Sequence, residues 1–285
     1  MITRSKYFPV NEDKASSLSV EDEPSKEDPQ PKPKKARKKH VEEKPEKRED
    51  SQSKWEPKNW QVLFENIKKM RSGADAPVDT MGCDRCHDRE APVKEQRFQT
   101  LVALMLSSQT RDEVNNAACI RLRNAGLSLD MILSTQTEEL EQLIKPVSFY
   151  RNKVKYLKRT CEILKKEFDG DIPDSVEGLC SLPGVGPKMA HLVMQVAWDQ
   201  VTGIAVDTHV HRISNRLKFV PKPTKEPVQT EKDLEDWMPT HLWKDYNTML
   251  VGFGQTICTP INPKCSLCLN KNICPSSTDK DKKAR

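Results

Sequence analysis

The chain has 285 residues, a formal net charge of +5, and hydrophobic and charged fractions of 35% and 31%. Its length allows one large domain or two small ones, and its modest positive charge permits a polyanionic partner without requiring one. Because it holds no apolar run long enough to span a bilayer and no signal-peptide core, we expect no membrane association and no secretion. In a reducing compartment its nine cysteines are expected to be thiols or metal ligands rather than disulfides.

Residues 1–54 are predicted to form a disordered charged tail. Between positions 21 and 50 only two residues are clearly apolar, so burial cannot offset the entropy cost of ordering the backbone. The run K-P-K-K-A-R-K-K at 32–39 is typical of a nuclear-import signal or a DNA-tethering arm, with a solvated charge run as the plain alternative. We expect a nuclear location. The first seven residues carry two basic residues and no acid, which also suggests the mitochondrion.

Order is expected from about Trp55 onward, beginning with an amphipathic helix. Its apolar residues recur at helical spacing: Trp60, Leu63, Phe64 and Ile67. The segment 72–93 is rich in Gly, Asp and Pro and is predicted to be a loop. It contains Cys83 and Cys86 in a C-x-x-C-H pattern. Because no second cysteine pair lies nearby to complete a zinc site, we expect ordinary thiols there.

Further helices are predicted over 98–107, 113–124, 138–144 and 154–168. No stretch alternates apolar and polar residues over strand length, so the fold class is all-α. Three cysteines lie in or beside apolar helix faces and are expected to be buried thiols: Cys119, Cys161 and Cys180.

Two polar or aromatic clusters interrupt these helices. The sequence S-S-Q-T-R-D at 107–112 follows a buried helix, and two interpretations stay open. It is a helix cap, or a DNA-facing loop in which Gln109 hydrogen-bonds a base left without its partner. Phe149 and Tyr150 stand beside Arg151 and Lys153. Such aromatics either wedge between bases next to a phosphate or close a turn from within the core.

A glycine-rich turn, L-P-G-V-G-P-K at 182–188, joins a short helix to a helix predicted over 188–198. Gly184 and Gly186 permit a tight turn and a close backbone approach to an anion, and the helix N-terminus adds partial positive charge. This helix-hairpin-helix pattern therefore predicts a site for a DNA phosphate, which carries no sequence information.

Two residues near this turn are candidates for chemistry. Lys188 lies in the first turn of its helix, where the helix dipole disfavours a cation. That placement suits an amine that must lose its proton to become a nucleophile, and the plain alternative is a phosphate-binding lysine. Asp207 stands where an N-cap belongs. A carboxylate fixed there can also stabilise a cationic sugar and take a proton from the lysine. His209 and His211 are expected to be polar helix residues or phosphate neighbours.

Four cysteines near the end of the chain predict a tetrathiolate site. They are spaced C-x6-C-x2-C-x5-C, and they are Cys258, Cys265, Cys268 and Cys274. Only the middle pair has the spacing usual for zinc, and the last cysteine precedes a proline as in ferredoxin-like runs. From spacing alone, zinc and a [4Fe–4S] cluster both stay open.

Together, L-S-S-Q-T-R-D at 106–112, L-P-G-V-G-P-K at 182–188, V-D-T-H-V at 206–210 and the cysteine spacing resemble the endonuclease III family of DNA glycosylases, in particular its eukaryotic members. The resemblance covers about 55–275. It implies a six-helix barrel domain with the helix-hairpin-helix over 98–215. It also implies an iron–sulfur cluster domain built from both chain ends, 55–97 and 216–278, followed by a short tail over 279–285.

The resemblance also implies roles for individual residues. Lys188 matches the lysine that forms a Schiff base with the sugar, and Asp207 matches the catalytic aspartate. Gln109 matches the glutamine that enters the space left by the extruded base, and Phe149 or Tyr150 stands where the family inserts an apolar wedge. The four terminal cysteines would hold a [4Fe–4S] cluster.

The implied activity is that of a DNA glycosylase and AP lyase on duplex DNA with oxidised pyrimidines, such as thymine glycol, or abasic sites. We expect a monomer whose N-terminal tail could contact downstream repair proteins. Two rivals are an adenine-removing glycosylase without lyase activity and a non-catalytic iron–sulfur protein that binds DNA. The first lacks a lysine at this position, and the pairing of Lys188 with Asp207 disfavours the second.

Overall fold

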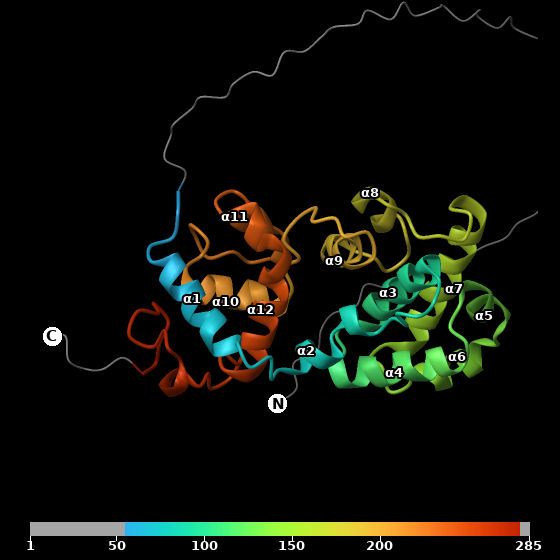
Figure 1. Ribbon diagram of the computed structural model, residues 1–285, viewed down its shortest axis with the longest axis horizontal. Helices are drawn as coiled ribbons and strands as arrows, with labels where there is room; N and C mark the ends of the chain where they lie inside the picture. Colours follow the sequence, from blue (N-terminus) through green and yellow to red (C-terminus); the bar gives the residue numbers. More distant parts are fainter. Residues whose placement is uncertain (1–54, 280–285) are drawn as a thin grey trace, which may run out of the picture. The chain divides into compact units, whose positions relative to one another are not determined.

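The computed structural model describes residues 55–279, and within them every regular element is a helix (Figure 1). The predicted all-α class is therefore confirmed for this part of the chain. The predicted charged tail with its basic run, and residues 280–285, lie outside the described residues. No helix that the structure describes is long and apolar enough to cross a membrane.

The elements follow one another along the chain with short connections. They are α1 (Trp60–Arg71), α2 (Pro77–Met81), η1 (Cys83–Arg85), α3 (Val93–Ser107), α4 (Asp112–Asn124), α5 (Leu129–Ser134), α6 (Thr137–Ile144), α7 (Tyr150–Glu167), α8 (Val176–Cys180), α9 (Pro187–Ala197), α10 (Thr208–Leu217), α11 (Pro227–Glu235), η2 (Thr240–Leu242), α12 (Trp243–Thr256) and η3 (Cys265–Leu267), where η denotes a 3-10 helix.

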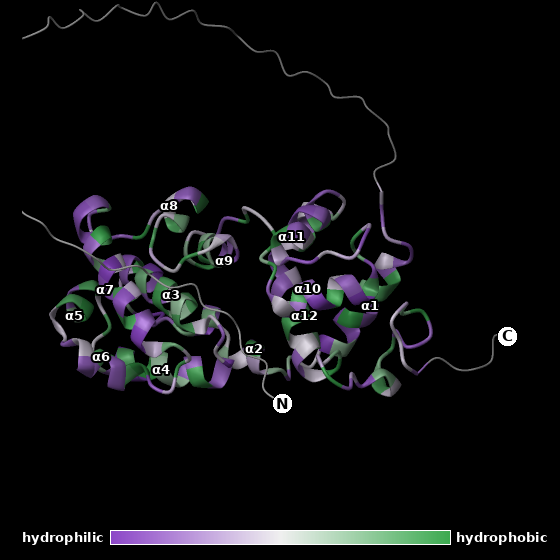
Figure 2. Cartoon of the chain, turned by 180° about the vertical axis from the view of Figure 1, so that it is seen from behind, coloured by the Kyte–Doolittle hydropathy of each residue, from purple (hydrophilic) through white to green (hydrophobic). Residues whose placement is uncertain are grey.

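A first hydrophobic core surrounds α3. Every residue from Phe98 to Leu106 is buried, because α3 packs against α4, α7 and α9 on different sides. The covering helices are amphipathic instead: α7 alternates polar and apolar segments along its length (Figure 2) and buries one face. This core positions the helix-hairpin-helix, since Leu182, Val185 and Ala190 are part of it.

A second hydrophobic core joins α1 to α10, α11 and α12, so that the first and last helices of the described chain lie side by side (Figure 1). Phe64 of α1 stacks on Tyr246 of α12 at 5.8 Å between ring centroids. The apolar face predicted for α1 is confirmed, with all four of its residues buried. α10 packs in this second core although it falls in the range 98–215 assigned to the barrel, and the domain boundaries stay a prediction.

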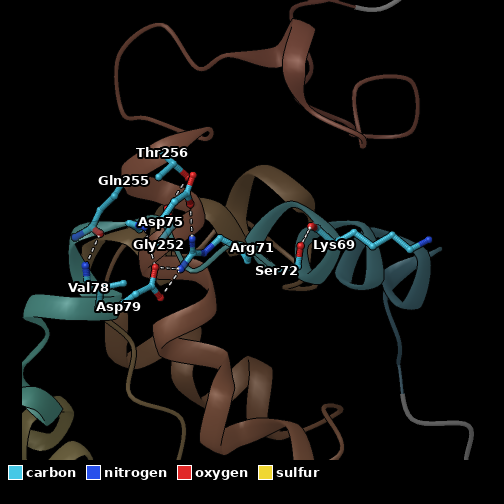
Figure 3. A network of polar contacts seen from close by, with 10 residues as sticks. Lys69, Arg71, Ser72, Asp75, Val78, Asp79, Gly252, Gln255 and Thr256 are labelled. Atoms are coloured by element: carbon cyan, nitrogen blue, oxygen red, sulfur yellow. Dashed lines mark hydrogen bonds and ion pairs between the residues drawn. The ribbon is translucent and has the colours of Figure 1, made fainter.

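The segment 72–93 was expected to be a loop, and this is wrong in part. It contains α2 and η1. No residue of α2 is buried, so the sequence has no apolar periodicity that would predict this helix. Polar contacts hold it instead: the buried guanidinium of Arg71 donates to Asp79 at 2.6 Å and to Asp75 at 3.1 Å, and Val78 N–H donates to Gln255 of α12 at 3.1 Å (Figure 3).

The other predicted helices are confirmed, with α3 and α7 beginning earlier than expected. Besides α2, three α-helices had not been anticipated: α5, α11 and α12. Two of the three cysteines expected to be buried are buried, Cys119 and Cys161. Cys180 is only half-buried, because it lies in the last turn of the short helix α8.

Candidate active site

The helix-hairpin-helix is formed by α8, a tight turn and α9. The Ser175 hydroxyl caps α8 by accepting from Gly178 N–H at 3.2 Å, and Val185 N–H closes the turn on Leu182 O at 3.2 Å. Gly184 has φ +80°, a conformation that costs other residues energy. Its Cα also faces a ring, since a Cβ added there would lie 2.8 Å from Tyr156 Cδ2.

Gly186 differs from Gly184 in its backbone. It is the N-cap of α9 with φ −110°, so the expectation that both glycines supply a tight turn holds only for Gly184. A Cβ at Gly186 would have no neighbour within 4 Å. Among residues 55–279 the N–H groups of both glycines have no hydrogen-bond acceptor. The turn therefore presents free donors beside a helix N-terminus, as an anion site requires.

Lys188 is the second residue of α9 and is half-buried. Within the described part of the chain its amine makes no hydrogen bond and no ion pair. Its charge acts on three groups from other elements: Cys83 of η1, Asp112 of α4 and His209 of α10. Lys188 therefore lies within electrostatic range of groups on η1, α4 and α10.

Asp207 is the N-cap of α10, as predicted, and its Oδ1 accepts from Val210 N–H at 2.8 Å. The buried residues before it are fixed on both sides, since Ile204 N–H donates to Glu235 at 2.8 Å and Ala205 O accepts from Asn247 at 2.6 Å. The carboxylate accepts a hydrogen bond from its own helix, and hydrogen bonds also hold the two residues that precede Val206. It therefore has little freedom to move. Asp207 therefore presents a fixed negative charge.

His209 brings the two candidates into one electrostatic neighbourhood. Burial lowers the pKa of His209, the carboxylate of Asp207 opposes this, and the cations of Arg212 and Lys188 lower the pKa further. The ring is tightly packed: a Cβ on Gly254 of α12 would lie 2.5 Å from its Nδ1. A neutral imidazole at neutral pH thus lies within range of both Lys188 and Asp207.

Asp112, the last residue of the 106–112 motif, was not singled out from the sequence. Its Oδ2 accepts from Gln255 Nε2 at 2.7 Å, which ties α4 to α12. Burial raises the pKa of Asp112, and the hydrogen bond from Gln255 opposes the rise. Two features of the sequence could have identified Asp112 as a site residue: it ends the 106–112 motif, and it lies in the first turn of α4.

The residues expected to touch DNA gather only in part. Gln109, Phe149 and Gly184 line one cavity of about 240 Å³, together with side chains of α7. Gln109 and Phe149 both have positive φ, +52° and +55°, and Phe149 is 63% exposed. Tyr150 instead packs against the first core and under the amine of Lys145 at 5.0 Å, and neither it nor Gly186 lines this cavity.

The four terminal cysteines line a single pocket beside Arg216 and Lys271. Arg216 Nη1 lies 3.4 Å from Cys258 Sγ, and Asn270 ties this segment to α1 by donating to Leu63 O at 2.9 Å. Nowhere in residues 55–279 are three Cys, His, Asp or Glu side chains arranged to hold a single metal ion. A tetrahedral zinc site needs four ligands around one ion, whereas a four-iron cluster takes one thiolate per iron. Four thiols lining one pocket supply one thiolate for each iron, so the residues present fit a four-iron cluster.

Cys83 and Cys86 lie against α3 and α4. Cys86 is buried, Cys83 is half-buried and accepts from Asn115 at 3.6 Å, and burial raises the pKa of Cys83 to about 11. Cys83 is therefore expected to stay a protonated thiol at neutral pH, whereas a hydrogen bond with Cys119 lowers the pKa of Cys86.

Comparison with known proteins shows the family of the chain. The family model described as "HhH-GPD superfamily base excision DNA repair protein" matches residues 102–240. Over 224 residues the chain is 58% identical to Endonuclease III-like protein 1 of Gallus gallus, which covers 79% of this chain and 80% of the relative. The chain belongs to the endonuclease III family. A more distant relative, the endonuclease III homolog of Schizosaccharomyces pombe, is 46% identical over 226 residues, 78% of this chain and 63% of its own.

Solved structures of endonuclease III share the fold. One is trapped as a covalent intermediate with DNA in an estranged-adenine complex, and it has 29% identity and a TM-score of 0.65. A non-covalent DNA complex has 30% identity and a TM-score of 0.64. Each covers 76% of this chain and 94% of its own. The endonuclease III fold is thus confirmed.

Proposed function

We propose that Lys188 and Asp207 carry the chemistry of this member of the endonuclease III family. The protein is a DNA glycosylase and AP lyase of base excision repair that acts on oxidised pyrimidines. The observation that supports the residue assignment is the position of the two side chains. Each starts a helix, and both charges act on the imidazole of His209.

In the proposed reaction, the neutral amine of Lys188 attacks C1′ of the damaged nucleotide and the N-glycosidic bond breaks, so the base leaves with the bond's electron pair. Asp207 stabilises the positive charge that develops on the sugar and accepts a proton from the lysine. The C1′–O4′ bond then breaks, O4′ takes up a proton, and the opened sugar is joined to Lys188 as an iminium ion, which makes the C2′ hydrogen acidic. Loss of that proton expels the 3′ phosphate by β-elimination and nicks the strand, and water then releases Lys188.

We propose that DNA is held by the cavity residues and the hairpin. The free N–H groups of Gly184 and Gly186 would bind a phosphate, and Gln109 would enter the gap left by the extruded nucleotide. Of the two aromatic candidates, Phe149 is the better wedge, since it is exposed at the cavity while Tyr150 is packed. Damaged duplex DNA is the partner of this surface, and we propose that a monomer binds it.

We propose that Cys258, Cys265, Cys268 and Cys274 hold a [4Fe–4S] cluster, as is common in the family. The bound cluster would crosslink the C-terminal segment, and Arg216 would donate to the Cys258 sulfur. Purified protein should show visible absorbance with iron and sulfide in equal amounts. Zinc in place of iron would contradict the proposal.

The proposed location is the nucleus, with the mitochondrion as a second destination. It rests on the basic run 32–39 and the acid-free first seven residues, which lie outside the described residues. Imaging of the full chain, with the basic run intact or neutralised to glutamine, tests it. An unchanged distribution would contradict an import role for the run.

The catalytic assignment is tested on a thymine-glycol duplex beside an undamaged duplex. Wild-type protein should release the base, nick only the damaged strand, and form a covalent adduct when borohydride reduces the imine. Lys188→Gln should lose all three, whereas Lys244→Gln, which removes an exposed ion pair with Asp199, should lose none. A Lys188→Gln variant that still gives the adduct would refute the assignment. Release of adenine without a nick, and no release of thymine glycol, would favour the adenine-type rival, and binding without any base release would favour the non-catalytic one.

A further inference from the structure

Lys153 is a buried cation whose three donors are all used. It lies in the first turn of α7 and is only 5% exposed. Its Nζ donates to Leu106 O at 2.6 Å, to Ser108 O at 2.6 Å and to Thr110 Oγ1 at 3.1 Å. An ammonium has three hydrogens, so no donor is left for another partner.

These acceptors belong to the end of α3, where helix carbonyls lack intrahelical partners. The other carbonyls of this end are satisfied locally. Leu104 O accepts from the Ser107 hydroxyl at 2.8 Å, and Ser107 O accepts from Thr110 N–H at 3.0 Å. Leu106 O has no such local donor, and Lys153 supplies one from a different helix. The lysine therefore acts as a C-cap of α3 in trans, with its charge at the negative end of the helix dipole.

The segment that Lys153 holds carries Gln109 at its tip. Gln109 has φ +52°, a conformation that costs a residue other than glycine energy and needs support from its surroundings. Its side chain is exposed and has no hydrogen-bond partner within the described residues. Gln109 and Lys153 line the same cavity. One ammonium thus holds the Ser108 carbonyl before Gln109 and the Thr110 hydroxyl after it, while the Gln109 side chain stays available.

We propose that Lys153 is a positioning residue that fixes the 106–110 segment so that Gln109 enters the gap left by an extruded nucleotide. The inference rests on the proposed role of Gln109 and adds that the Lys153 ammonium positions it.

Lys153 is not itself placed to attack the sugar. Burial lowers the pKa of Lys153 to about 8, so at neutral pH it remains mostly protonated and keeps its three hydrogen bonds. The side chain of Lys188, by contrast, makes no hydrogen bond or ion pair within residues 55–279. The two lysines therefore have separate roles, and a borohydride adduct distinguishes them.

A double-mutant cycle with Lys153→Met and Gln109→Ala in the full-length protein tests the inference, with single-turnover base release from thymine-glycol duplex as the readout. We expect each single variant to lower the rate at least about tenfold, and the double variant to fall no more than about threefold below the slower single variant. This non-additivity marks residues that act as a unit. Lys153→Arg, which keeps charge and donors, should recover part of the lost rate.

Two further measurements separate positioning from general destabilisation. Borohydride trapping on an abasic site in a single strand has no gap to fill, so Lys153→Met should trap within about twofold of wild type. Lys158 offers a matched control, since it also lies on α7 and its Nζ donates to Thr135 O, at the end of α5, at 2.6 Å. Lys158→Met should lower the melting temperature without slowing base release.

The outcomes are distinct. If Gln109→Ala alone leaves the rate unchanged, the proposed role of Gln109 fails and this inference fails with it. If Gln109→Ala is slow but the two losses multiply in the double variant, Lys153 acts independently of Gln109 and only this inference is overturned. Lys153→Met with wild-type kinetics on duplex, or with no trapping on the single strand, also overturns it.

Discussion

The two glycines of the hairpin should respond in opposite ways to alanine. At Gly184, φ is +80° and an added Cβ would lie 2.8 Å from the Tyr156 ring. At Gly186, φ is −110° and an added Cβ would meet nothing within 4 Å. One substitution therefore strains the backbone and collides, and the other does neither.

The magnitudes follow from these geometries. A left-handed alanine costs about 1–2 kcal/mol. The collision with Tyr156 adds about 1–3 kcal/mol of overpacking. Gly184→Ala should thus lower the melting temperature by at least about 4 °C, at roughly 2–4 °C per kcal/mol. Gly186→Ala should raise the free energy of unfolding by about 0.4–1 kcal/mol, because alanine reduces the entropy of the unfolded chain.

Thermal unfolding and DNA binding should be measured on the same variants. Tyr156→Ala should rescue the collision part of the Gly184→Ala loss and leave the backbone part. Gly186→Ala should keep its stability yet bind duplex DNA more weakly, since a methyl group would stand where a phosphate approaches. Wild-type stability in Gly184→Ala, or an equal loss in Gly186→Ala, would refute the reasoning.

Substitutions at three other residues test further parts of the structure. Asp207→Asn keeps an N-cap, so it should retain stability while the rate of base release falls about 10²-fold or more. Asp207→Ala should lose the same activity and also about 1 kcal/mol of stability. Equal stability in the two variants would contradict the capping role. Because burial holds the pKa of His209 low, the unfolded chain takes up its proton first as the pH falls below about 6.5. The free energy of unfolding should therefore fall over that range, and His209→Gln should flatten the decline; parallel pH curves would count against this. Gly252→Ala places a methyl group on the Arg71 guanidinium and should cost about 1–3 kcal/mol in chemical denaturation, whereas unchanged stability would show that Arg71 can move away.

Much of the site was accessible from the sequence because it depends on local rules. The cap at Asp207, the turn at Gly184 and the uninterrupted apolar run of α3 each follow from residue type and position. The choice between Phe149 and Tyr150 as the wedge did not follow from the sequence. Adjacent residues on one turn point in different directions, and only the backbone conformation decides which one is exposed. In the structure Phe149 is 63% exposed, whereas Tyr150 packs against the first core.

Other features depend on contacts between distant segments. α12 contains Gly252 and Gly254, which lower helix propensity. Both positions need glycine, because Arg71 packs against Gly252 and His209 against Gly254, and a Cβ at either position would collide with them. The burial of Lys153 is equally unpredictable, since a lysine beside aromatics looks like a surface contact until the end of α3 supplies its acceptors.

The central claim is that Lys188 is the nucleophile, and peptide mapping of the trapped adduct tests it most directly. Wild-type protein is reduced with borohydride on a thymine-glycol duplex and digested, and the modified lysine is located by mass spectrometry. We expect the sugar remnant on Lys188 alone. A remnant on Lys153, or on any other lysine with Lys188 unmodified, would contradict the claim.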